Sequence, residues 1–239
     1  MQYAADSSAH SAATIARLLS DRLPIRSVLD VGCAYGTWVK AWIQAGVVDA
    51  AGMDGDYVDR ARIEIANELF VSHDLNQSFD LGRRFDLVQS LEVGEHIKPS
   101  SSEDFVASIA AHASTFVLFS AAPPGQGGEF HINEQPYDYW RELFGKHGFV
   151  PVDWLRKSIS SDVRISYWYR YNTVLYVRNE SQGDLPAEMA ACILEADVPI
   201  PDVSPLLFRL RKMIVGLLPS RLQHEVARLK SWIFPTSRF

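Results

Sequence analysis

Two glutamates and a histidine lie close together in the segment LEVGEHI, residues 91–97. If a helix starts here, Glu92, Glu95 and His96 take positions i, i+3 and i+4 and share one face. Two converging carboxylates repel each other unless a cation lies between them, and oxygen-rich ligands with an imidazole suit Mg²⁺, Mn²⁺ or Fe²⁺. His131, in the polar segment GGEFHINEQP, is a fourth candidate ligand. The pattern predicts a divalent-metal site formed by Glu92, Glu95, His96 and His131.

The same residues also have a simpler interpretation, which stays open. Glutamate and histidine near a helix start are often solvated or satisfy its free amide groups. Glu92 could contact the amino group of a bound ligand instead of a metal. His131 could be a ligand or a general base that takes a proton from a nucleophile. The sequence does not distinguish between these roles.

A second set of candidate residues follows three predicted strands in succession. DVGCAYGTW (30–38) opens a helix, and Gly32 and Gly36 let its backbone approach a ligand. Asp54 ends the second strand, where a carboxylate can accept hydrogen bonds from both ribose hydroxyls. Asp74 ends the third, where it could accept a bond from the exocyclic amine of adenine. Each aspartate could be a helix cap, but three successive strand ends at one sheet edge favour a nucleotide site.

Seven strands and the helices between them must position these residues. Alternating and β-branched apolar runs predict strands over 27–32, 47–54, 70–75, 85–91, 115–123, 151–159 and 168–178. Helical apolar spacing predicts helices over 8–20, 37–45, 61–70, 102–112 and 136–149. Strands that alternate with helices form a parallel sheet covered on both faces. The last two strands have no predicted helix between them, so we expect the last one to be antiparallel.

The order DVGCAYG, GMD, HDL, FDLVQSLEVGEHI resembles the motif series of class I S-adenosylmethionine-dependent methyltransferases, over residues 27 to about 178. The resemblance implies an α/β fold with a Rossmann-like, doubly wound, mostly parallel seven-stranded sheet and an antiparallel last strand. The G-x-G-x-x-G pattern of NAD and FAD sites is absent. Ala34 stands where this family usually has glycine, so we expect at most weaker binding there.

The resemblance also implies which residues bind S-adenosyl-L-methionine. In that family the first loop holds the methionine part, the second-strand acid the ribose and the third-strand aspartate the adenine. Carried over, the cofactor-binding residues are Asp30, Gly32, Cys33, Gly36, Asp54, Asp74, Leu75 and Leu91.

The cluster of Glu92, Glu95, His96 and the later His131 resembles two metal-dependent groups, the small-RNA 2′-O-methyltransferases and the ubiquinone-pathway O-methyltransferases. In those enzymes the cation binds substrate hydroxyls, which implies Mg²⁺ or Mn²⁺ here and catalytic roles for Glu92, His96 and His131. The predicted reaction is O-methylation of a small hydroxylated acceptor such as a sugar, glycan or secondary metabolite. Two alternatives are RNA 2′-O-methylation and a catalytically silent cofactor-binding subunit that serves a partner.

The acceptor prediction depends partly on charge. The net charge is −6, and from Val203 onward seven basic residues accompany one acid, so the tail carries +6 and the remainder −12. An acidic body argues against nucleic-acid binding, which needs a basic surface. The segment 120–140 is long, polar and aromatic, as expected of a loop that closes on a small acceptor, with Gln126, Asn133 and Glu134 as candidate partners of sugar hydroxyls.

We expect three regions: a cofactor-binding domain over 1–180, a linker over 181–202, and a basic amphipathic helical tail over 203–239. The tail has the composition of an interfacial membrane helix, although a helical hairpin docked on the domain or on a second subunit explains it as well. Two distant cysteines form no disulfide framework, and no signal-peptide pattern opens the sequence, so we expect a cytoplasmic protein with peripheral membrane contact as an open alternative.

Overall fold

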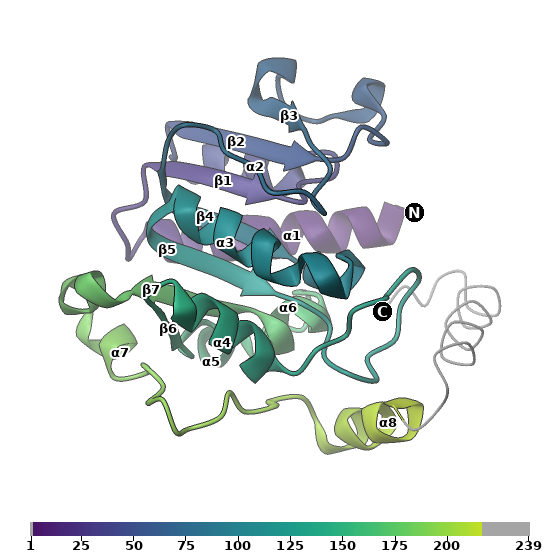
Figure 1. Cartoon of the computed structure of the whole chain (residues 1–239), viewed down its shortest axis with the longest axis vertical. Coiled ribbons are helices and arrows are strands. Elements are labelled where there is room, and N and C mark those ends of the chain that lie inside the picture. Colours follow the sequence, from purple (N-terminus) through teal and green to yellow (C-terminus); the bar gives the residue numbers. More distant parts are fainter. Residues whose placement is uncertain (1, 217–239) are drawn as a thin grey trace.

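The computed structural model describes residues 2–216, and their side chains from residue 8 onward. Seven strands form one sheet in the order β3-β2-β1-β4-β5-β7-β6 (Figure 1). The strands are β1 (Ser27–Val31), β2 (Asp49–Asp54), β3 (Phe70–Ser72), β4 (Phe85–Leu91), β5 (Ala113–Ser120), β6 (Phe149–Val152) and β7 (Val174–Arg178). The α-helices are α1 (Gln2–Ser20), α2 (Thr37–Gln44), α3 (Ser102–His112), α4 (Tyr137–Lys146), α5 (Leu155–Ile159), α6 (Tyr167–Asn172), α7 (Ala187–Ala190) and α8 (Leu206–Gly216).

The strand directions confirm the predicted fold class. β1 runs parallel to β2 and β4, and β4 runs parallel to β5. β7 is antiparallel to both of its neighbours, β5 and β6. In Figure 1 the arrowheads of β1, β2 and β5 point to the right, so the carboxyl ends of these strands share one edge of the sheet. Ligands of doubly wound folds bind at this edge.

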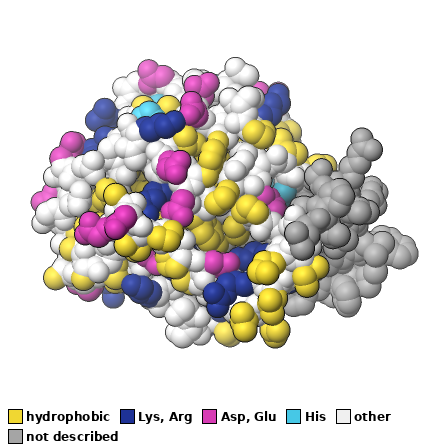
Figure 2. Space-filling model, turned by 60° about the horizontal axis from the view of Figure 1, so that its bottom comes forward, with side chains coloured by type: hydrophobic (Ala, Val, Ile, Leu, Met, Phe, Trp, Pro, Cys, Tyr) yellow, Lys and Arg dark blue, Asp and Glu magenta, His cyan; other side chains and the backbone are white. Residues whose placement is uncertain are grey.

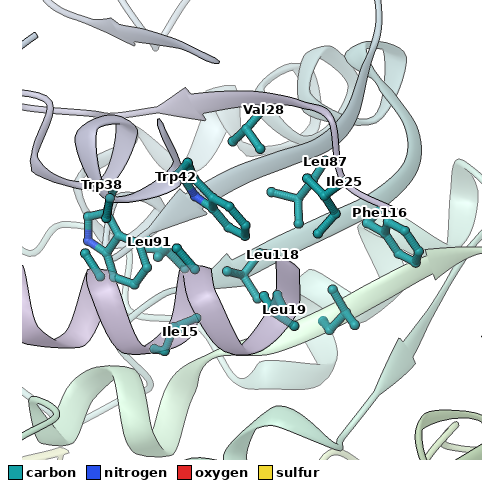
Figure 3. Close-up of a cluster of buried hydrophobic side chains, with 14 of the residues drawn as sticks. Ile15, Leu19, Ile25, Val28, Trp38, Trp42, Leu87, Leu91, Phe116 and Leu118 are labelled. Carbon is teal, nitrogen blue, oxygen red and sulfur yellow. The ribbon is translucent and has the colours of Figure 1, made fainter. Parts of the chain in front are cut away.

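Helices cover both faces of the sheet. On one face, Ile15 and Leu19 of α1 and Trp38 and Trp42 of α2 pack on strand side chains that include Leu118 (Figure 3). The other face is covered mainly by α3 and α4, whose buried side chains are Phe105, Val106, Ile109, Trp140, Leu143 and Phe144. Burying both faces fixes the strand order, and with it the positions of the loops at the carboxyl edge.

The two predicted strands at the end of the domain are both present, but their predicted bounds are wrong. Residues 151–159 contain only the end of β6, and the rest forms α5, in which Leu155 and Ile159 are buried four residues apart. Residues 167–172 form α6 instead of a strand. Its aromatic residues favour strand, but β5 ends at Ser120, and Phe119 already pairs with Val174. A longer β7 would therefore lack a neighbour at this end.

The predicted helix over 61–70 is also wrong. This segment contains two short 3₁₀ turns, Arg60–Arg62 and Asn67–Leu69. Between them the backbone amide of Glu64 donates to the carbonyl of Tyr35 at 2.8 Å. Ile65 packs against Gly36, where an added Cβ would lie 2.9 Å from its Cγ1. Contacts with the loop before α2 thus replace the helical hydrogen bonds.

The segment after β7 lies against the domain before it reaches α8. Leu194 donates its backbone amide to Pro151 at 3.0 Å, and Ile200 is buried. The domain boundaries remain a prediction, and residues 217–239 of the predicted tail lie outside the described residues. Among the helices that the structure describes, none combines the length and the apolar composition needed to cross a membrane.

Candidate active site

A cavity of about 960 Å³ opens at the carboxyl edge of the parallel strands. Its walls come from the loops after β1, β2, β3 and β4. Of the residues that the sequence predicted as functional, it is lined by Gly32, Asp54, Asp74, Leu75, Glu92 and His96. The structure therefore brings the ends of four strands to one ligand-sized space.

The loop after β1 approaches the cavity closely because Gly32 has no side chain. Gly32 has a φ of +87°, and a Cβ there would lie 2.3 Å from Cγ2 of Val93. Ala34 also has a positive φ, 46°, in the left-handed region that favours glycine. The alanine thus keeps the backbone shape of the loop at some conformational cost, and it still lines the cavity.

Asp54, at the end of β2, holds this loop in place. One carboxylate oxygen accepts a hydrogen bond from the amide of Ala34 at 2.7 Å, and the other accepts one from the amide of Gly55 at 2.7 Å. The hydroxyl of Tyr57 also donates to Asp54. Although Tyr57 is 80% exposed, its hydroxyl lies against Asp54, where partial desolvation and this bond to a carboxylate raise its pKa, so the hydroxyl stays protonated and remains a donor.

Tyr57 therefore competes with any ligand hydroxyl that binds Asp54. We predict that Tyr57→Phe, which keeps the ring but removes the donor, strengthens S-adenosylhomocysteine binding about fivefold, the effect of one hydrogen bond of ~1 kcal/mol. Titration calorimetry of the two proteins measures the change. Equal or weaker binding by the variant would show that the tyrosine hydroxyl is not a competitor.

Asp74 and Leu75, in the loop after β3, also line the cavity. Asp74 is exposed, and hydrogen bonds from the backbone amide and the side chain of Asn76 lower its pKa. The carboxylate is therefore ionised at neutral pH and can accept a hydrogen bond. Leu75 is buried beside it and provides an apolar contact.

Four predicted cofactor residues do not line the cavity but support it. Asp30 is buried, and burial together with the charge of Asp54 raises its pKa to about 7. Cys33 is buried against Gly52, Leu91 belongs to the core, and Gly36 precedes α2 with a φ of +86°. Burial also raises the pKa of the Cys33 thiol, which makes it a packing residue and not a nucleophile.

Glu92 does not share a helix face with Glu95 and His96. The chain leaves β4 with Glu92 at a φ of 57°, and only a 3₁₀ turn, Gly94–His96, follows. The Glu92 carboxylate accepts hydrogen bonds from the side-chain amides of Asn172 and Gln126, both at 3.1 Å. The helix considered for this segment is thus absent, and Glu92, which lines the cavity, is held by these two amides and not by Glu95 or His96.

Glu95, His96 and His131 do come together. One ligand atom from each lies within 4.8 Å of the others, an arrangement that could hold a metal ion. The two imidazole rings are 5.0 Å apart, and His131 Nε2 is 4.0 Å from a Glu95 carboxylate oxygen. Because His96 also lines the cavity, this cluster adjoins the space that the first four loops enclose.

The neighbours of the two histidines orient them like ligands. Nδ1 of His131 lies 2.7 Å from Oε1 of Glu134, and Nδ1 of His96 lies 3.1 Å from the carbonyl oxygen of Phe130. Both contacts use Nδ1 and leave Nε2 of each ring available, and Nε2 of His131 lies toward Glu95. Metal-binding histidines usually donate their second ring nitrogen to a carboxylate or a carbonyl in this way.

Glu95 is the most unusual member of the cluster. Its carboxyl group is fully buried, and among the described residues neither oxygen has a hydrogen-bond partner of good geometry. Burial and the nearby Glu92 charge raise its pKa well above the usual range, and the nearby backbone amides of Glu95 and Ala122 only partly oppose this rise. A buried, unpartnered carboxylate is costly unless it is neutralised by a proton or by a cation.

Comparison with known families identifies the domain. The pattern of the methyltransferase domain family matches residues 3–151, more than half of the chain. The chain belongs to this family. The predicted class, a class I S-adenosylmethionine-dependent methyltransferase, is thereby confirmed. The finer resemblance to metal-dependent O-methyltransferases remains a prediction, and no curated protein matches the sequence.

Two solved methyltransferase structures have the same fold, and a third structure matches over part of its length. The sugar N-methyltransferase KedS8 from Streptoalloteichus sp ATCC 53650 is 18% identical, with a TM-score of 0.55 over 70% of this chain and 86% of that chain. CalS10, an amino pentose methyltransferase from Micromonospora echinaspora, is 15% identical, with a TM-score of 0.51 over 71% and 90%. Streptomyces venezuelae DesVI is 28% identical, but this chain spans about half of its length, with 50% and 52% covered and a TM-score of 0.43.

Sequence reasoning missed two residues of the methyltransferase site. Asn172 was assigned to a strand, so its position beside Glu92 was not foreseen. Tyr57 carried no signal beyond its closeness to Asp54 in the sequence. Conversely, Asn133, a candidate acceptor contact, is buried and bonds to Gly94 and Ser102, which makes it a support for the loop.

Proposed function

We propose that this methyltransferase transfers a methyl group from S-adenosyl-L-methionine to a hydroxyl oxygen of a small acceptor, a sugar, glycan or secondary metabolite. The observation that carries the proposal is the cluster of Glu95, His96 and His131 beside the four-loop cavity. The cavity would hold the cofactor, with Asp54 on the ribose, Asp74 and Leu75 on the adenine and the loop at Gly32 on the methionine part. The cluster would then lie on the acceptor side.

A hydroxyl oxygen that attacks a sulfonium methyl loses its proton, so the reaction needs a group that accepts this proton. The methyl group is already electrophilic, so the protein has to orient the hydroxyl and accept its proton. His131 could take this proton at Nε2, because its Nδ1 is engaged by Glu134. Glu92 would fix the orientation of the acceptor loop through Gln126.

The donor set also fits a divalent cation such as Mg²⁺ or Mn²⁺. Glu95, His96 and His131 would hold it, with His131 as a ligand in place of its role as the base, and the buried Glu95 carboxylate without a well-aligned hydrogen bond is the feature that favours it. A bound cation would lower the pKa of an acceptor hydroxyl. Glu92, predicted as a fourth ligand, lies outside this group of three and is bonded elsewhere.

The test combines binding with turnover. Calorimetry with S-adenosylhomocysteine, in EDTA and then with Mg²⁺ or Mn²⁺, should give micromolar binding. An assay of methyl transfer from S-adenosylmethionine under the same conditions should show a change in turnover when the metal is added. The acceptor panel pairs each hydroxylated sugar or phenol with its amino analogue and adds an RNA oligonucleotide. Methylation of the hydroxyl forms supports the proposal, whereas transfer only to amines or RNA overturns it. Cofactor binding without any transfer would favour a silent subunit.

The predicted membrane contact or self-association of the C-terminal tail is a separate matter, because it depends on α8 and not on these loops. A cytoplasmic location likewise remains a proposal.

A further inference from the structure

α8 presents an apolar face to the outside of the protein. Five apolar side chains are exposed, by 43% to 81% of their surface: Leu206, Leu207, Leu210, Met213 and Ile214. Lys212 and Val215, on the other side of the helix, are buried. At about 100° per residue, the five exposed side chains span a continuous face of about 120°. Figure 2 brings this side forward and shows hydrophobic side chains with Lys and Arg beside them at the lower right, where Figure 1 places α8.

An arginine flanks this apolar face on each side. By the same helical geometry, Arg209 lies about 40° beyond Met213, and Arg211 lies about 40° beyond Leu207 on the opposite edge. Arg209 is exposed, and Arg211 is half-buried. A helix with an apolar face between two basic edges has the pattern of an interfacial helix, in which long basic side chains reach toward headgroups while apolar ones enter the acyl boundary.

The other face of α8 is anchored, so the apolar face has a fixed direction. Lys212 forms a salt bridge with Asp202 at 2.6 Å. Phe208 packs on Tyr167 of α6, with ring centroids 4.9 Å apart. Arg211 donates to the carbonyl oxygen of Gln126 at 3.3 Å, and Gly125 lies directly against the backbone of Lys212. α8 is thus attached to the loop that follows β5.

We propose that the apolar face of α8 binds an anionic lipid surface and holds the protein on it as a peripheral protein. Charge favours a lipid surface over two other possible partners of this face, a second copy of the protein and residues 217–239. A second copy would bring arginine edges against arginine edges, because a symmetric contact pairs like surfaces. If residues 217–239 covered this face, basic residues would again meet the two arginines. This segment carries Arg221, Arg228, Lys230 and Arg238 against the single acid Glu225. Anionic headgroups complement both the edges and this sequence.

The lipid surface would then lie beside the acceptor side of the proposed site. The loop that α8 contacts also carries Phe130 and Ile132, which are 78% and 53% exposed on either side of His131. If the proposed function holds, an acceptor presented at a lipid surface could reach the site directly. Membrane binding itself depends only on α8.

Vesicle flotation of the full chain tests the proposal. Binding to vesicles of phosphatidylcholine with phosphatidylglycerol should exceed binding to phosphatidylcholine alone and should fall with added salt. Leu207→Glu with Leu210→Glu should reduce it at least about tenfold, because two apolar side chains no longer enter the boundary. Arg209→Glu should reduce only the part that depends on anionic lipid. Val48→Glu is the matched control, since Val48 is 86% exposed but lies before β2, and it should bind like the parent.

Two further measurements identify the other occupants. The proposal is overturned in favour of a second copy if the parent protein binds neither kind of vesicle, is dimeric by light scattering, and loses the dimer in the double variant. If the parent protein is monomeric and binds neither kind of vesicle, the proposal is overturned in favour of residues 217–239 packing on this face. Calorimetry with S-adenosylhomocysteine shows whether each variant is folded, and failure of that binding in the parent would count against the proposed function, not against the lipid surface.

Discussion

Replacing Asp54 by asparagine is expected to weaken S-adenosylhomocysteine binding about 100-fold. Hydrogen bonds to a charged acceptor contribute about 1.5–3 kcal/mol each, and the proposed ribose contacts would lose much of that in the amide. Part of the loss should come through the protein itself. One Asp54 oxygen holds the amide of Ala34, and an asparagine amide in that place would set one donor against another. Titration calorimetry gives the dissociation constant of each protein.

Asp56→Asn is the matched control for this experiment. Asp56 lines the same cavity two residues further on, but it is exposed and at the rim. Its substitution removes the same charge and should change binding less than threefold, a difference of ~0.6 kcal/mol. Equal losses in both variants would mean that the acidity of the cavity matters and not a specific carboxylate at the end of β2.

The substitution Glu95→Gln should separate stability from activity. Without metal, the variant should melt no lower than the parent, because a buried carboxylate without a well-aligned hydrogen bond is replaced by a neutral group of the same shape. With Mg²⁺ or Mn²⁺, the parent should melt higher through ligand binding to its folded state, and the variant should not. Turnover should fall about 100-fold or more if the cluster works as proposed. Thermal melts with and without metal, together with an assay of methyl transfer, check all three results.

Glu68→Gln provides the comparison for the glutamate experiment. Glu68 is exposed, lies before β3 and is not among the residues that line the cavity. It should leave the melts, the metal response and turnover unchanged. A Glu95→Gln enzyme that keeps full turnover, together with a parent indifferent to chelators, would exclude the metal and leave Glu95 as a buried structural acid.

The sequence was informative where local pattern and position in the sheet agree. Asp54 and Asp74 each follow a strand in a region of alternating strands and helices, so their meeting at one edge could be predicted from topology alone. The segments 61–70 and 167–172 were assigned wrongly because their local propensities were overruled by distant contacts. Glu64 bonds to Tyr35, and Tyr169 packs on Trp38 with ring centroids 5.1 Å apart. No pattern within either segment reveals these partners.

The proposed acceptor side was predicted less well than the proposed cofactor side for a related reason. The position of Glu92 depends on a positive φ, which the LEVGEHI pattern does not indicate, and on Asn172, 80 residues away. The proximity of Glu95, His96 and His131 was foreseen, although the helix expected to create it is absent. The loop after β5 creates it instead, through the amides of Ile132 and Asn133, which bond to the Glu95 carbonyl at 2.9 and 3.0 Å.

The reversed direction of β7 adds Asn172 to the site from a segment that precedes a strand and does not follow one. A parallel strand delivers the residues that follow it to the carboxyl edge, and Asp54 and Glu92 are placed in this way. An antiparallel strand delivers the residues that precede it, and so α6 and Asn172 reach the same edge from the other direction. Insertions or exchanges just upstream of β7 would therefore change the surroundings of Glu92 and leave intact both the cofactor loops and the loops after β4 and β5 that carry Glu95, His96 and His131. One short stretch of the gene can thus vary this part of the site separately from the rest.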